Sequence, residues 1–505
     1  MTRIPFDWRR AIWTKVALAA ALTAAADALL FDRAVGINIA LFCFAALSAA
    51  ALVHPEARRD RRALAAFTAA AAFGLLLADR PGVIASAMFL AATGVAVLSP
   101  RASSEGDVLA WMLRFVRAAL TAVAAPIQDL RKVSARGGRP GAVRRLAVGA
   151  MLPLAGGAMF LSLFVMANPL IETAVEGWRL PPFSPGRLVF WLFVAIGAWA
   201  LMRPRGARRR IVIASRPRAP GAASTSVMAS LVVFNLLFAL QNGLDAAFLW
   251  SGAPLPAGVT FADYAHRGAY LLIVTALLAG AFVLAFLRPG AAESRAVRWL
   301  VIGWVVQNLM LVASSALRTV DYVEAYGLTQ LRISALAWMG LVGVGLVLIC
   351  VRLIAGKSAS WLIGANTAAM AAVLTAVAVV DIGAIAAAWN VRHAREVTGR
   401  ADAPRLDLCH LRELGPAALL PLARLEALPG KPEKLALAVS AARAAALKEL
   451  QIRQADWRTW TWRGQRRLEA ARAMGAGGAL AWDRSCDWDT VTPPPRLTPT
   501  PQAGS

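Results

Sequence analysis

Long apolar runs dominate the chain, separated by short stretches of charged residues, glycine and proline. An apolar helix of about 17–25 residues can cross a hydrocarbon core about 30 Å thick. The pattern therefore predicts an all-α, polytopic membrane protein with about eleven transmembrane helices. The eleven runs fall at residues 12–31, 35–53, 63–79, 82–98, 146–168, 188–202, 226–250, 268–287, 299–317, 333–354 and 361–389.

The polar stretches between the runs predict how the chain is divided. Asp79-Arg80-Pro81-Gly82 predicts a tight reversal between two helices. Residues 105–121 place apolar and basic side chains on different helical faces, as an interfacial helix does. The chain becomes much more polar after Asn390, which predicts a small helical extramembrane domain. The expected parts are a four-helix transmembrane part at 1–98, a basic segment with the interfacial helix at 99–145, a seven-helix core at 146–390, the helical domain at 391–489 and a disordered Pro/Thr tail at 490–505.

Composition supports a membrane protein. Of 505 residues, 58% are hydrophobic and 16% are charged, which is too apolar for a set of water-soluble domains. The net charge of +25 is carried by Lys and Arg clustered between the apolar runs, where they orient spans and meet anionic lipid. We therefore expect the lipid bilayer as a partner and no nucleic acid. The first run is too long for a signal peptide and leads straight into another, so we expect a retained helix.

Basic residues also predict the orientation. With a cytoplasmic N-terminus, the six cytoplasmic segments hold 29 Lys and Arg, whereas the five opposite connections hold 7. This bias follows the positive-inside rule. It predicts a multi-pass inner-membrane protein with its C-terminal domain in the periplasm.

One outer connection, residues 318–332, concentrates charged and aromatic side chains between two apolar runs. Tyr322 and Tyr326 share a helical face, Gly327 suits the left-handed end of a helix, and Thr329 suits the cap of the next. Arg332 then falls in the first turn of that helix, where the macrodipole disfavours a cation. We expect it to pair with Asp321 or Glu324, or with an anionic ligand.

Polar side chains within the runs lie close in depth to the outer loops, which predicts a polar pocket that opens outward. Each of them also has a simpler reading as an interhelical hydrogen bond. The candidate ligand-binding residues are Tyr264, His266, Arg267, Asn242, Asp245, Arg318, Asp321, Tyr322, Glu324, Tyr326, Thr329, Arg332 and Asp381.

Several of these positions belong to longer motifs: Tyr264-Ala-His-Arg-Gly268, Tyr322-Val-Glu-Ala-Tyr-Gly-Leu-Thr-Gln-Leu-Arg332, Asp381 with Asn390, and a segment from Asp407 to Leu419. With these motifs the chain resembles, over roughly residues 220–430, a bacterial family of polytopic membrane proteins known only as a domain of unknown function, of the 4153/4173 type. The resemblance implies a multi-span inner-membrane protein and no particular activity.

The sequence predicts no catalytic constellation, metal site or cofactor. The cysteines and histidines lack metal-ligand spacing, and no glycine pair has phosphate-loop spacing. Cys409 and Cys486 can form a disulfide if the tail lies outside.

Three function classes stay open. In order of preference they are a binding, scaffold or envelope-sensing protein with a polar outer site for an envelope protein or anionic ligand, a transporter of a small solute or lipid, and a transferase on a lipid-linked substrate.

Overall fold

The computed structural model describes residues 8–101, 108–136, 184–203, 224–250 and 295–475, with single positions between 156 and 168 and at 274. Every regular element in these residues is helical, which confirms the predicted all-α class. The chain divides into two compact units. Unit 1 comprises Met1–Ile211 and Asp456–Thr461, and unit 2 comprises Val212–Ala455 and Trp462–Ser505.

Unit 1 contains six α-helices in the described residues: α1 (Trp8–Leu30), α2 (Ile37–Val53), α3 (Arg61–Asp79), α4 (Val83–Leu98), α5 (Val108–Arg136) and α8 (Pro185–Met202), with short 3-10 turns at Pro55–Arg59 and Ser99–Arg101. Helices α3 and α4 form the expected hairpin, because Arg80 and Gly82 are extended and leave only a tight turn between them.

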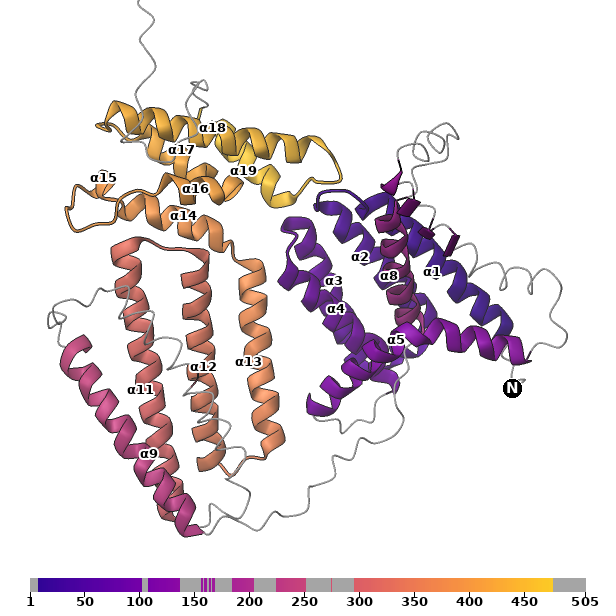
Figure 1. Ribbon diagram of the computed structural model, residues 1–505, viewed down its shortest axis with the longest axis horizontal. Helices are drawn as coiled ribbons and strands as arrows, with labels where there is room; N and C mark the ends of the chain where they lie inside the picture. Colours follow the sequence, from indigo (N-terminus) through magenta and orange to yellow (C-terminus); the bar gives the residue numbers. More distant parts are fainter. Residues whose placement is uncertain are drawn as a thin grey trace, which may run out of the picture. The chain divides into compact units, whose positions relative to one another are not determined.

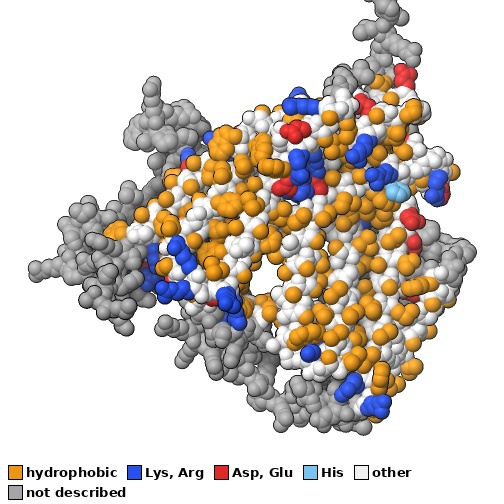
Figure 2. All heavy atoms as spheres, turned by 180° about the vertical axis from the view of Figure 1, so that it is seen from behind, with side chains coloured by type: hydrophobic (Ala, Val, Ile, Leu, Met, Phe, Trp, Pro, Cys, Tyr) orange, Lys and Arg blue, Asp and Glu red, His pale blue; other side chains and the backbone are white. Residues whose placement is uncertain are grey.

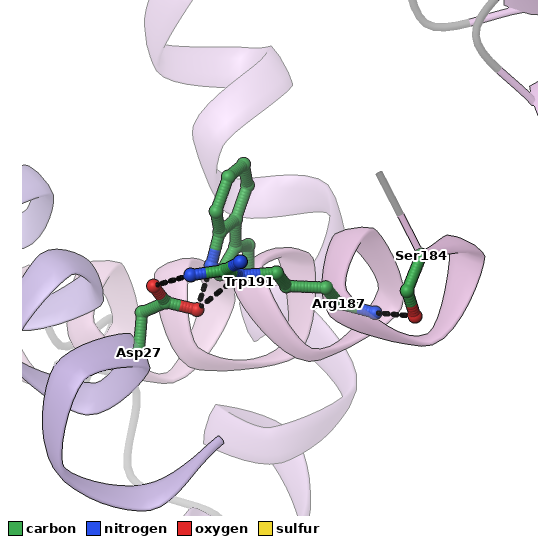
Figure 3. Close-up of polar contacts among 4 residues, drawn as sticks. All are labelled: Asp27, Ser184, Arg187 and Trp191. Atoms are coloured by element: carbon green, nitrogen blue, oxygen red, sulfur yellow. Dashed lines mark hydrogen bonds and ion pairs between the residues drawn. The ribbon is translucent and has the colours of Figure 1, made fainter. Parts of the chain in front are cut away.

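An ion pair joins α1 to α8 (Figure 3). The Arg187 guanidinium donates to both carboxylate oxygens of Asp27, at 2.8 and 2.5 Å, and the Trp191 indole N–H donates to the same carboxylate at 2.8 Å. Ser184 caps the start of α8. Asp27 lies near the end of α1 and Arg187 near the start of α8, so the two helices are antiparallel. This contact gives the acidic side chain of an apolar run a partner, as burial in a membrane requires.

Unit 2 has four long helices: α9 (Ser224–Asp245), continued by a π-helical turn η3 (Ala246–Trp250), α11 (Arg295–Tyr326), α12 (Gln330–Ile354) and α13 (Ala359–Val379). Further helices, most of them shorter, lie across one end of them (Figure 1). These are α14 (Ile382–His393), α15 (Arg395–Thr398), α16 (Leu408–Glu413), η5 (Gly415–Ala418), α17 (Leu419–Ala427), α18 (Glu433–Ala455) and α19 (Trp462–Ala473). We call this layer the helical cap.

The helical cap has its own apolar core. Leu411, Leu422, Leu425, Leu435 and Val439 are almost fully buried in it. Burying side chains of this kind is worth about 1.5–3 kcal/mol each. Their contacts hold the cap together independently of any membrane.

Seven helices in the described residues are long and apolar enough to cross a membrane. They are α1, α3, α8, α9, α11, α12 and α13, and the shorter apolar helices α2 and α4 match two further predicted runs. The runs predicted at 146–168 and 268–287 lie largely outside the described residues. Apolar side chains cover the outer faces of the long helices (Figure 2), as in a membrane protein. The count of eleven stays a prediction.

The last apolar run differs from its predicted form. A single helix is expected over 361–389, but α13 ends at Val379, Val380 is extended, and Asp381 caps a separate helix α14. Helix α14 lies in the helical cap and its Ala387 and Val391 join the cap core. One apolar face of α14 is therefore covered by protein, so the run divides into one membrane-crossing helix and one cap helix.

Candidate functional site

The turn between α11 and α12 has the local structure that its sequence predicts. Gly327 has φ +81°, and its N–H donates to the Val323 carbonyl at 2.8 Å, which closes the end of α11. The Thr329 hydroxyl then accepts from the Arg332 N–H at 3.3 Å and caps α12. The rings of Tyr322 and Tyr326 lie with centroids 4.8 Å apart on one face. Glycine is required at the turn because φ is positive.

Asn390 of α14 fixes this turn to the helical cap. Its side-chain oxygen accepts from the Leu328 N–H at 2.6 Å and its amide nitrogen donates to the Leu328 carbonyl at 2.8 Å. A Cβ on Gly327 would lie 2.9 Å from that oxygen. The Asn390 amide thus pairs with the backbone as a neighbouring strand would, and it satisfies both polar groups of Leu328.

Arg332 reaches back to the end of α11. Its guanidinium donates to the Gly327 carbonyl and lies over the Tyr322 ring, 4.2 Å from the centroid. It forms no ion pair with Asp321 or Glu324. A cation at the C-terminal end of a helix is stabilised by the macrodipole, so the cost of placing Arg332 in the first turn of α12 is offset at the end of α11.

Asp321 and Glu324 face a different space. They line a pocket of about 520 Å³ together with Trp389, His393, Arg400 and Asp402. The walls come from the last turns of α11, from α14 and from the loop after α15. The Trp389 and His393 rings stack with centroids 4.3 Å apart. The pocket therefore combines carboxylates with an aromatic wall.

The charges of this pocket are unevenly compensated. Arg400 donates to Asp402, and this contact lowers the pKa of the Asp402 carboxyl and raises the pKa of the Arg400 guanidinium, with a smaller contribution from Glu324. The carboxylates of Asp321 and Glu324 form no hydrogen bond or ion pair with the described residues. Both lie near the C-terminal end of α11, where the macrodipole is negative and disfavours an anion. The pocket is therefore a negatively charged site beside an indole ring.

A second polar group lies between α9 and α11. Asp245 pairs with Arg318, and their exposed fractions are 2% and 6%. Gln241 donates to the same Asp245 carboxylate at 3.1 Å, and Asn242 donates to the Gln307 carbonyl at 3.1 Å. A buried ion pair of this kind needs both partners, because removing one leaves an uncompensated charge.

Asp381 occupies the junction between α13 and α14. Its carboxylate accepts from the Ala384 N–H at 3.0 Å and pairs with Arg463 and Arg467 of α19. Arg463 also donates to the Val379 carbonyl at 2.8 Å. Asp381 therefore lies at the end of the last membrane-crossing helix, where it joins that helix to the cap.

The family is decided by comparison with known proteins. The model of a family described as a domain of unknown function (DUF4153) matches residues 15–425. The chain belongs to this family. The match begins far earlier than the resemblance at 220–430 that the motifs carry. Neither the curated proteins nor the solved structures include a match to this chain.

Within this DUF4153 chain, the predicted site residues form three groups. Tyr322, Tyr326, Thr329 and Arg332 meet at the α11–α12 turn, Asp321 and Glu324 line the pocket, and the third group lies between α9 and α11. That third group is Asn242, Asp245 and Arg318. Asp381 stands apart from these, and Tyr264, His266 and Arg267 lie outside the described residues. No cluster of three potential metal ligands occurs in the parts of the chain that the structure describes.

The pocket also includes residues that sequence reasoning did not select. Trp389 and His393 follow the motif residue Asp381 by two turns or more, and Arg400 and Asp402 lie in a short loop beyond them. The motif position Asn390 was the one signal in the sequence that could have pointed to this pocket, because Trp389 and His393 lie beside it on α14 and form the aromatic wall. Nothing local marks the loop residues, because they approach Asp321 and Glu324 only through the fold.

Proposed function

We propose that this multi-pass membrane protein is a binding or sensing protein of the cell envelope that takes a cationic, amine-bearing ligand in the pocket lined by Asp321, Glu324 and Trp389. The orientation proposed from the positive-inside rule places this pocket at the outer face of an inner membrane. The observation that carries the proposal is the pair of carboxylates without an ion-pair partner in the described residues, next to an indole ring in a space of about 520 Å³.

Three physical effects favour a cation there. The two carboxylates repel each other and attract a positive charge, the negative end of α11 adds to that attraction, and the indole face stabilises an ammonium group by about 0.5–2 kcal/mol. A primary amine also supplies hydrogen-bond donors, which carboxylates accept. The anionic ligand expected at Arg332 stays a separate prediction, because that guanidinium lies at the turn and not in this pocket.

The test is binding of spermidine and of ethanolamine to the purified protein in lipid nanodiscs, by calorimetry and thermal shift. We expect binding to at least one amine and a loss of about tenfold or more in affinity, about 1.4 kcal/mol, in the Asp321→Asn/Glu324→Gln variant. Glu469→Gln is the matched control, because that carboxylate accepts only from Gln465 at 2.8 Å in α19. Absence of amine binding, or unchanged affinity in the double variant, would overturn the proposal.

Inorganic phosphate serves as the competing probe. If phosphate binds and Arg332→Gln removes that binding, the anionic-ligand prediction at the turn is correct, and the amine proposal is decided by the amine measurement alone. Binding of either the amine or phosphate would agree with a binding protein and would show whether its ligand is a cation or an anion.

A transporter is the second candidate, because the polar residues between α9 and α11 continue toward the middle of the membrane, as transport sites do. Uptake of a labelled amine into proteoliposomes separates the two candidates. Accumulation would favour transport, and binding without accumulation would favour a sensor.

A further inference from the structure

A row of hydrogen bonds follows the contact between α9 and α11. Asn235 donates to the Leu300 carbonyl at 3.0 Å and Asn242 donates to the Gln307 carbonyl at 3.1 Å. In both contacts the acceptor comes 65 residues after the donor. A constant offset means that the two helices run in the same direction. We call this contact the polar seam.

The polar seam reaches far into the apolar part of unit 2. The Gln307 amide nitrogen donates to the Asn235 side-chain oxygen at 2.9 Å, and the ion pair of Asp245 with Arg318 lies farther along. Ten residues separate Asn235 from Asp245, which is a rise of about 15 Å, or half of a hydrocarbon core. Each amide in such surroundings costs free energy unless it is fully hydrogen-bonded.

Three buried oxygens in the polar seam have no donor: Oδ1 of Asn242, Oδ2 of Asp245 and Oε1 of Gln307. The Asn242 and Asp245 side chains are only 7% and 2% exposed. The side-chain nitrogens of Asn242 and Gln307 already donate to protein oxygens. Rotating either amide by 180° would therefore satisfy its oxygen's position at the expense of the hydrogen bond that its nitrogen now makes. An unsatisfied buried acceptor costs about 1–3 kcal/mol. These oxygens are acceptors, and buried donor nitrogens of Trp304 and Arg318 lie along the same contact. The seam therefore suits a small partner that both donates and accepts hydrogen bonds, as water does.

The two ends of the polar seam differ. At one end Arg318 lies one helical turn before Asp321, which lines the pocket of about 520 Å³. At that end the regular α9 helix also gives way to the π-helical turn η3 immediately after Asp245, a feature that is frequent at functional sites. The other end is closed by an apolar cluster that includes Leu231, Val297 and Val301, whereas Trp304 of the same cluster borders the seam one turn before Asn308.

We propose that the polar seam is a solvated site that takes water, or a small neutral ligand that both donates and accepts hydrogen bonds. Arg318 neutralises Asp245, so the site favours a neutral occupant. The apolar cluster prevents the ligand from passing farther. This site uses other residues than the amine pocket, and it stands if the amine proposal fails.

The experiment measures water in the polar seam by cysteine reactivity in nanodiscs. The background is Cys43→Ser/Cys350→Ser, which removes the two free thiols. A thiol reacts as thiolate, which forms in water and not in lipid. We expect methanethiosulfonate ethylammonium to modify Asn242→Cys and Gln307→Cys about tenfold faster or more than Leu240→Cys. Leu240 is the control because it lies on the same helix and is 64% exposed on its outer surface.

Val301→Cys tests the closed end and should stay unmodified. Thermal melting identifies any variant that does not fold, and hydroxyl-radical footprinting of the unsubstituted protein gives an independent readout, because bound water oxidises side chains beside it. Oxidation of Phe238 or Trp304, which pack against each other, is then expected. If both seam cysteines react as slowly as Leu240→Cys, or the footprint shows no oxidation there, the seam is dry and the proposal is wrong.

Discussion

Asn390 shows how a single side chain can replace secondary structure. The turn that ends α11 leaves the Leu328 N–H and C=O without helical partners, and the Asn390 amide binds both. No other uncharged side chain except Gln presents a donor and an acceptor side by side. Gln is longer by one methylene group, so its amide would not fit the short distance between α14 and the turn. Glycine at position 327 permits this distance, because a Cβ there would lie 2.9 Å from the Asn390 side-chain oxygen.

We expect Asn390→Ala to lower the free energy of unfolding by about 1–3 kcal/mol, because it leaves two buried backbone groups unsatisfied. Thermal or denaturant unfolding in nanodiscs measures the change. Asn366→Ala is the matched control, since the Asn366 amide donates only to the Leu362 carbonyl of its own helix at 2.9 Å. Equal losses in the two variants would show that Asn390 does not fix the turn.

Arg332 and Tyr322 form the next pair at this scale. The guanidinium lies over the ring and caps α11 through the Gly327 carbonyl. We expect Arg332→Gln to cost about 1–2 kcal/mol of stability from the combined loss of the cation–π contact and the favourable helix end. A double-mutant cycle with Tyr322→Leu should show coupling of about 0.5–1 kcal/mol.

The matched cycle pairs Arg332→Gln with Glu324→Gln and should be additive, because no ion pair joins these residues. Unchanged stability in Arg332→Gln with loss of a ligand would instead support the anionic-ligand reading. Coupling between Arg332 and Glu324 would contradict the geometry described above.

The sequence predicted the parts of this site that depend on neighbours in the chain. Gly327 and Thr329 have the predicted roles because left-handed turns and helix caps are properties of a few consecutive residues. The partner of Leu328 lies 62 residues away, and no local pattern encodes such a contact. Likewise, only the folded α11–α12 turn shows that Arg332 contacts the Tyr322 ring and not a neighbouring carboxylate.

At the scale of elements, the division of the last apolar run illustrates the limit of hydrophobic patterning. Residues 361–389 contain no proline, and only Asp381 and Gly383 mark the break in the apolar pattern. The helix ends at Val379 because Asp381 offers a cap for α14 and α19 offers two arginines for Asp381. Hydropathy cannot separate a helix covered by lipid from one covered by a protein layer.

Asp381→Asn tests this junction. Asn caps a helix as well as Asp does, so the variant keeps the start of α14 and removes only the charge that pairs with Arg463 and Arg467. We expect the helical cap to lose about 1–3 kcal/mol of stability, with faster proteolysis and amide exchange in α19, because two partly buried arginines lose their partner. Asp402→Asn is the control, since its pair with Arg400 is exposed and worth little. Equal exchange in α19 for both variants would contradict this role.

At the scale of the whole molecule, helix directions agree with the predicted alternation of spans. Helices α1 and α8 are antiparallel, whereas α9 and α11 are parallel. The connection between α9 and α11, residues 251–294, lies almost entirely outside the described residues, and its sequence contains the apolar run at 268–287. The additional span at 268–287 stays a prediction from hydropathy.

In each unit, taken by itself, one turn between two helices meets residues from the C-terminal part of the chain. In unit 1 the Ile37 N–H donates to the Trp460 carbonyl at 2.8 Å, so residues 456–461 lie at the turn where α1 has ended and α2 begins. In unit 2 the helical cap covers the α11–α12 turn through Asn390. Both turns belong to the connections with few basic residues, which the positive-inside rule assigns to the outside.

If the C-terminal layer lies outside, as the positive-inside rule predicts, a prediction about cysteine chemistry follows. Cys409 is disulfide-bonded, whereas Cys43 and Cys350 have free thiols. Disulfides persist in oxidising compartments and are rare in the cytosol. The expected partner, Cys486, lies outside the described residues. We therefore expect the denatured, unreduced protein to titrate with two free thiols and the reduced protein with four, and Cys409→Ser to yield one additional thiol without reduction.

Impermeant maleimide on intact spheroplasts tests the side of the membrane directly. In the Cys43→Ser/Cys350→Ser background, Gly475→Cys at the end of the helical cap should be labelled before lysis, because an outer cap is exposed to the reagent. Lys357→Cys, in the turn between α12 and α13 at the opposite end of those helices, should be labelled only after lysis. Labelling of both before lysis would mean leaky cells. The reverse pattern, with four thiols in the denatured unreduced protein, would place the cap in the cytoplasm, where its disulfide would be reduced and the amine pocket would face the cell interior.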